Sequence, residues 1–102
     1  FSRSSTGIGS SRGWPQNYQD LGGILSPDPT LNPDFFSWNA VWVAYCDGGS
    51  YTGGRELPVV YNNTKLFYRG RANMEAVALD LMQTQGLSSA THVIMDGGSA
   101  GE

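Results

Sequence analysis

A helical pattern flanked by two short apolar runs constrains the fold of this chain more than any other feature. Between residues 71 and 85 apolar side chains recur three and four positions apart, which predicts an amphipathic helix ended by Gly86. The runs at residues 40–46 and 91–95 are nearly unbroken and apolar, as in strands buried on both faces. Strand, helix and strand in this order build parallel sheets with a right-handed crossover, so we predict an α/β fold. The apolar stripe of the helix comprises Met74, Val77, Ala78, Leu81 and Met82.

The first 39 residues have a different character, because they are rich in serine, glycine and proline and show no sustained apolar period. Each proline fixes its own φ and biases the preceding residue away from helix, so this region is predicted as mostly loop, with a short turn near residues 21–25. A loop of this length is unusual inside a compact domain. We therefore expect residues 1–102 to be one partial domain that rests on a body lying partly outside this sequence.

Charge and length exclude several classes of protein. The 102 residues carry a net charge of -3 and scattered basic side chains, whereas nucleic-acid-binding proteins present a basic face. No run approaches the roughly 18 apolar residues that cross a bilayer. Because the chain begins at Phe1 with no signal-like stretch behind it, we expect an internal piece of a longer protein.

Two residues bear on the cellular compartment. Cys46 is the one cysteine: in an intracellular protein it would be a small buried apolar residue, and in a secreted one it would pair with a cysteine outside this chain. Asn62 opens an Asn-Asn-Thr triplet, which is an acceptor for N-glycosylation on secreted loops but also occurs by chance.

The segment that follows the second predicted strand carries the most specific chemistry. Residues 97–101 match Gly-x-Ser-x-Gly, in which Ser99 would sit on a tight strand-to-helix turn. Side chains two residues to either side would clash there, so Gly97, Gly98 and Gly101 suit the turn. The N–H of Ala100 would then help to hold a developing oxyanion. A chance glycine-rich turn is the alternative, and the position after a predicted strand favours the nucleophile.

The remaining side chains offer no partner for this serine. His92 lies at the start of the predicted strand, about 20 Å from Ser99 if the seven steps are extended, so we predict a structural role for it. In α/β-hydrolases the acid and the histidine follow the serine in the chain. With one cysteine, one histidine and no ligand spacing among the carboxylates, we expect neither a metal nor a cofactor.

Two other features are open between a structural and a functional role. The aromatic cluster of Trp38, Trp42 and Tyr45 is more typical of a core than of a platform for sugars. The loop at residues 47–54 leaves the carboxyl end of a predicted strand, where α/β sheets bind ligands. Its candidate site-lining residues are Asp47, Gly48 and Ser50.

Three blocks of sequence, taken in order, resemble the pectin acetylesterase family, which also includes the Notum carboxylesterases. The first comprises Thr6-Gly7-Ile8-Gly9-Ser10-Ser11, Gly23-Ile24-Leu25-Ser26 and Asn32-Pro33-Asp34-Phe35-Phe36-Ser37-Trp38-Asn39. The second is Tyr45-Cys46-Asp47-Gly48-Gly49-Ser50-Tyr51-Thr52-Gly53, and the third joins Phe67-Tyr68-Arg69-Gly70 to the Gly-x-Ser-x-Gly motif. The Asp47-Gly48 and Arg69-Gly70 pairs look more like the pectin acetylesterase branch.

The resemblance implies an α/β-hydrolase-like fold and a secreted or cell-wall carboxylic ester hydrolase that removes acetyl groups from a polysaccharide. It implies Ser99 as nucleophile, Ala100 as an oxyanion-hole amide, and a disulfide from Cys46 to a residue outside this chain. Gly98 departs from the family's usual cysteine, and Glu102 from a usual glycine. Glu102 and the missing catalytic partners motivate one alternative, a non-catalytic secreted binding protein on the same scaffold. The other alternative is an inactive truncated fragment.

Overall fold

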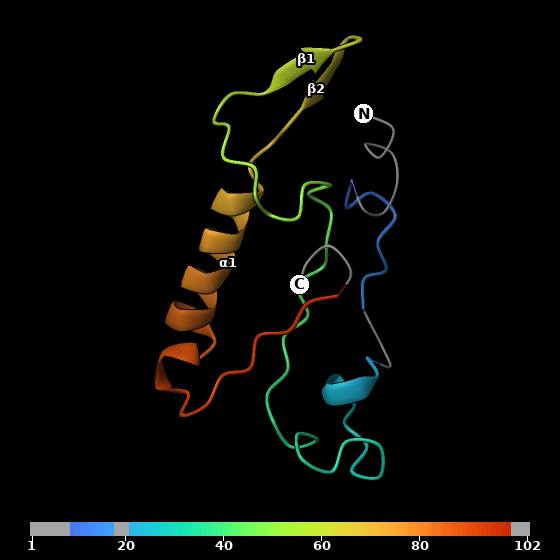
Figure 1. Cartoon of the computed structure of the whole chain (residues 1–102), viewed down its shortest axis with the longest axis vertical. Helices are drawn as coiled ribbons and strands as arrows, with labels where there is room; N and C mark the ends of the chain where they lie inside the picture. Colours follow the sequence, from blue (N-terminus) through green and yellow to red (C-terminus); the bar gives the residue numbers. More distant parts are fainter. Residues whose placement is uncertain (1–8, 18–20, 99–102) are drawn as a thin grey trace. The chain divides into compact units, whose positions relative to one another are not determined.

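The computed structural model describes residues 9–17 and 21–98, and within these it contains one α-helix, one β-hairpin and two 3-10 turns (Figure 1). The chain divides into two compact units, of which one comprises residues 13–44 and the other comprises residues 1–12 together with residues 45–102. The fold is thus a small mixed helix and strand arrangement. No helix among the described residues is both long enough and apolar enough to cross a membrane.

Polar contacts organise the unit of residues 13–44. Its 3-10 turn η1 (Gly23–Leu25) lies where a short turn was predicted, and the rest of its described residues are loop, as expected. Asn32 is 5% exposed, and its Nδ2 donates to the carbonyls of Ile24 (2.9 Å) and Ser26 (2.8 Å). Its Oδ1 accepts from the N–H of Phe35 at 3.2 Å. The buried side-chain amide of Asn32 therefore joins η1 and the residue after it to the turn at residues 32–35. Its polar atoms all have partners, as buried polar atoms generally do.

The helix α1 (Gly70–Thr84) confirms the predicted helix to within one residue at each end. It is followed by Gly86 with φ of 80°, a left-handed conformation that glycine adopts without a Cβ penalty. The second 3-10 turn, η2 (Leu87–Ser89), comes directly after it and contacts α1. The predicted apolar stripe is only partly covered: four of its five side chains are half-buried, and the fifth, Met82, is exposed.

The hairpin of β1 (Val59–Tyr61) and β2 (Thr64–Leu66) was not predicted from the sequence. The strands pair antiparallel in the register Val59 with Leu66 and Tyr61 with Thr64, so that Asn62 and Asn63 form a two-residue loop. Both asparagines have positive φ, 48° and 58°, as a type I′ turn requires. Asparagine tolerates this conformation better than other residues with a side chain.

The predicted strands at residues 40–46 and 91–95 are absent from the structure, and this part of the prediction is wrong for the chain as it stands. A strand exists only through ladder hydrogen bonds to a neighbouring strand, and the sheet in the described part of the chain consists of β1 and β2 alone. Their apolar side chains are correspondingly open, with Trp42 54% and Met95 90% exposed.

No apolar side chain among the described residues is fully buried. The buried side chains are instead two polar ones, Ser26 and Asn32. This part of the chain therefore has no hydrophobic core of its own. It lacks the apolar burial that is the dominant favourable contribution to folding.

Candidate functional site

Ser99, the predicted nucleophile, lies outside the described residues, as do its neighbours Ala100 and Gly101. The chain is described up to Gly98, and Gly97 and Gly98 are exposed. A Cβ at Gly98 would meet no atom within 4 Å. The structure therefore leaves the prediction for residues 97–101 as it was.

Asp47 organises the loop that follows it through its carboxylate. Its Oδ2 accepts from the backbone N–H of Gly49 at 2.9 Å and from that of Tyr51 at 2.8 Å. The phenol oxygen of Tyr45 accepts from the N–H of Ser50 at 2.9 Å. The three successive N–H groups of residues 49, 50 and 51 thus donate to the side chains of Asp47 and Tyr45.

This loop holds backbone conformations that are unfavourable for residues with side chains. Ser50 and Tyr51 have φ of 54° and 55°, and Gly48 has φ of 68°. A left-handed conformation costs a residue with a Cβ about 1–2 kcal/mol. Two hydrogen bonds to a charged acceptor, at about 1.5–3 kcal/mol each, are sufficient to offset this strain.

The loop is anchored on the start of α1 by backbone hydrogen bonds and by the absence of side chains at two glycines. The N–H of Arg71 donates to the carbonyl of Gly53 at 3.0 Å, and the N–H of Arg55 donates to that of Tyr68 at 2.8 Å. A Cβ at Gly53 would lie 2.8 Å from the Tyr68 carbonyl oxygen. A Cβ at Gly70 would lie 2.6 Å from Oδ2 of Asp47, so the carboxylate packs directly against this glycine.

The surroundings of Tyr51 are partly apolar. Its ring meets that of Tyr45 edge-on, with centroids 5.4 Å apart. Burial raises the pKa of the Tyr51 phenol above 10.0, and the nearby Cys46 and Asp47 groups add to this rise.

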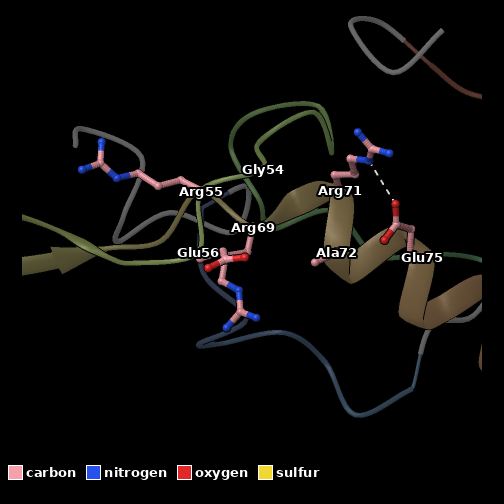
Figure 2. A pocket seen from close by; sticks show the side chains of 7 residues that line it. All are labelled: Gly54, Arg55, Glu56, Arg69, Arg71, Ala72 and Glu75. Atoms are coloured by element: carbon pink, nitrogen blue, oxygen red, sulfur yellow. Dashed lines mark hydrogen bonds and ion pairs between the residues drawn. The ribbon is translucent and has the colours of Figure 1, made fainter.

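A hollow of about 360 Å³ lies beside the first turn of α1 (Figure 2). Its lining comprises Gly54, Arg55, Glu56, Arg69, Arg71, Ala72 and Glu75. The guanidinium groups of its three arginines point in different directions, and Arg71 Nε contacts Glu75 Oε1 at 3.0 Å (Figure 2). The charges of these side chains do not converge on one point (Figure 2).

The other predicted site residues are placed as follows. Cys46 is half-buried and has no disulfide partner among the described residues. Asn62 is exposed in the turn of the hairpin. His92 is exposed, with Nδ1 3.1 Å from Oγ1 of Thr91. The described part of the chain contains no group of three potential metal ligands.

Sequence reasoning missed the contacts that hold the loop after Asp47, which are the N–H groups of Gly49 and Tyr51 on its carboxylate and the close packing at Gly53 and Gly70. An aspartate two residues before a glycine is a signal for a turn closed by the side chain. The two glycines gave no comparable signal, because the need for them arises from contacts across about 20 residues of sequence.

Comparison with known proteins defines the class. The chain belongs to the pectinacetylesterase family, whose model matches residues 1–102. It is 42% identical over 99 residues to pectin acetylesterase 5 of Arabidopsis thaliana, and 40% identical over 99 residues to pectin acetylesterase 4 of the same plant. These matches cover 97% of this chain, and 22% and 24% of the two proteins.

More distant relatives belong to the Notum branch. The chain is 33% identical over 92 residues to the palmitoleoyl-protein carboxylesterase NOTUM of Schmidtea mediterranea, a match that covers 90% of this chain and 16% of that protein. No solved structure matches the chain. The resemblance noted in the sequence is therefore confirmed at the level of the family, and the chain spans less than a quarter of the length of these relatives.

Proposed function

We propose that the full-length protein containing this chain is a carboxylic ester hydrolase that removes acetyl groups from pectin or a related cell-wall polysaccharide. The observation that carries this proposal is the family match over the entire chain. The identity of 40–42% to pectin acetylesterases over 97% of the chain exceeds the 33% to planarian NOTUM. This difference favours an acetyl ester on a polysaccharide over a fatty acyl ester on a protein.

Ser99 is the proposed nucleophile, because it occupies the centre of the Gly-x-Ser-x-Gly motif. Its Oγ attacks the acetyl carbonyl carbon, and a histidine elsewhere in the protein takes the hydroxyl proton. The N–H of Ala100 donates to the resulting oxyanion. The histidine then gives that proton to the departing sugar oxygen as its bond to the acetyl carbon breaks. In the second half of the reaction the histidine takes a proton from water, which attacks the acetyl-serine, and returns the proton to Ser99 Oγ as acetate leaves.

We further propose an α/β-hydrolase-like sheet, in which residues 40–46 and 91–95 would be strands of the full-length protein. Their apolar side chains, which are open here, would then be covered by neighbouring strands and helices. The loop after the first strand and the serine after the second would lie at the same edge of the sheet. We place the protein outside the cell, with a carbohydrate at Asn62 and a disulfide at Cys46.

The test is to express the full-length protein and measure turnover of p-nitrophenyl acetate and release of acetate from acetylated pectin. We expect activity on both substrates and at least a thousandfold lower kcat in Ser99→Ala, as for loss of other serine nucleophiles. If Ser99→Ala kept the wild-type rate, the proposed nucleophile would be wrong. A folded protein that binds the polysaccharide without hydrolysing it would favour the alternative of a binding protein, to which Glu102 points.

A further inference from the structure

The loop at residues 47–54 combines a strained backbone with hydrogen bonds from two side chains. Two residues with side chains hold left-handed backbone conformations in it, and strained backbone of this kind clusters at functional sites. The strained backbone therefore points to a functional reason for this loop.

Asp47 is unsuited to proton transfer in this loop. Its Oδ2 is occupied by the N–H groups of Gly49 and Tyr51, and the carboxylate packs against Gly70. A general base needs a lone pair directed at the substrate, and this carboxylate directs its oxygens at its own loop and at α1. What the carboxylate fixes is the position of the residues between its two donors.

The same hydrogen bonds limit what the loop can bind. The amides of residues 49–51 are engaged by Asp47 and Tyr45, so they are not free to hold an oxyanion. The hydroxyl of Thr52 donates to the Gly49 carbonyl at 2.7 Å. The hydroxyl of Ser50, by contrast, makes no hydrogen bond with any described residue. A loop whose amides are closed and whose central hydroxyl is open suits a partner rich in hydroxyl groups.

We propose that Asp47 is a positioning residue that holds Ser50 in place to bind the polysaccharide chain beside the ester. This inference rests on the proposed function and extends it to the recognition of the sugar part of the substrate. The loop would lie at the carboxyl edge of the sheet, where the strand ending at Cys46 and the strand leading to Ser99 both finish. Asp47 acts through the backbone of residues 49–51, and Ser50 makes the contact.

Kinetics on two substrates test this inference, because only one of them has a sugar chain. In the full-length protein we expect Asp47→Ala to raise KM for acetylated pectin about tenfold, because a charged hydrogen-bond acceptor is lost. We expect Ser50→Ala to raise the same KM about threefold, because one neutral hydrogen bond to the sugar is lost. Both variants should keep kcat/KM for p-nitrophenyl acetate within about twofold of wild type. Asp47→Asn retains one accepting oxygen and should recover part of the KM.

The matched control is Asp28→Asn. Asp28 also closes a turn through its carboxylate, accepting from the N–H of Thr30 at 2.8 Å, but it belongs to the other unit of the chain. It should alter neither substrate. An unchanged KM for pectin in Ser50→Ala, or a parallel loss on both substrates in Asp47→Asn, would overturn the inference while wild-type turnover left the proposed function standing. Absence of turnover in the wild type would remove both.

Discussion

Replacing Gly70 by alanine should destabilise the full-length protein through the carboxylate of Asp47. The new Cβ would lie 2.5 Å from Cγ and 2.6 Å from Oδ2 of Asp47, which is closer than van der Waals contact allows. The carboxylate must therefore move away from Gly70 and lose its hydrogen bonds to the amides of Gly49 and Tyr51. At the lower end of the range for charged acceptors, because Asp47 is half-exposed, two such bonds amount to about 3 kcal/mol.

A gain in helix propensity works in the opposite direction. Alanine is better than glycine inside a helix by about 1 kcal/mol, and Gly70 is the first residue of α1. The net loss in the free energy of unfolding should therefore be about 2 kcal/mol. Equilibrium unfolding in urea, followed by circular dichroism, measures this quantity.

A double-mutant cycle separates the proposed cause from a general disturbance of the helix. In an Asp47→Ala background the carboxylate is gone, so Gly70→Ala should be neutral or slightly stabilising. Gly54→Ala is the matched control, because a Cβ there would meet no atom within 4 Å and its φ is not positive. An equal loss from Gly70→Ala in both backgrounds, or no loss in the wild type, would refute the reasoning.

Three further predictions concern other parts of the chain. Full-length protein from a secretory host should carry a glycan at Asn62, and Asn62→Asp should remove the glycan without disturbing the positive φ of the turn. An intact-mass difference of about 1 Da between wild type and variant, which is the mass change of the substitution alone, would contradict this. The hydroxyl and N–H of Thr30 hold the pKa of Asp28 below 3.8, so the stability that its ionised form contributes is present above pH 3.8 and is lost as pH falls through the lowered pKa. Thr30→Val should raise that pKa in an NMR titration, and an unchanged midpoint would exclude the hydroxyl as the main cause. The isolated 102-residue chain, with no buried apolar side chain among its described residues, should show neither a cooperative melt nor a near-UV circular dichroism signal.

The helix was predictable because its signals are local. Apolar spacing within residues 71–85 and Gly86 at the end are read from neighbours along the chain, and both were confirmed. The strands were not, because a strand depends on hydrogen bonds from residues distant in sequence. Apolar runs at residues 40–46 and 91–95 report burial in a larger sheet, and the described residues do not supply one.

The hairpin and the Asp47 loop were missed for different reasons. The hairpin had a local signal, which is the pair of asparagines at its turn between segments with β-branched residues. A search for long apolar runs does not detect this signal, because both strands are short. Asp47 was singled out as a site-lining residue, but its contact with Gly70 joins positions 23 residues apart. Such a contact appears only when the chain is folded, and it is one of the observations from which we propose Asp47 as a positioning residue.

The most direct test of the account is to label the full-length protein with a fluorophosphonate and locate the adduct by peptide mass spectrometry. Fluorophosphonates react with serines that are activated as nucleophiles. The account predicts one adduct, on Ser99, formed in parallel with the loss of acetyl esterase activity and absent from Ser99→Ala. Complete inhibition with the adduct on another residue, or full activity after Ser99 is labelled, would contradict it.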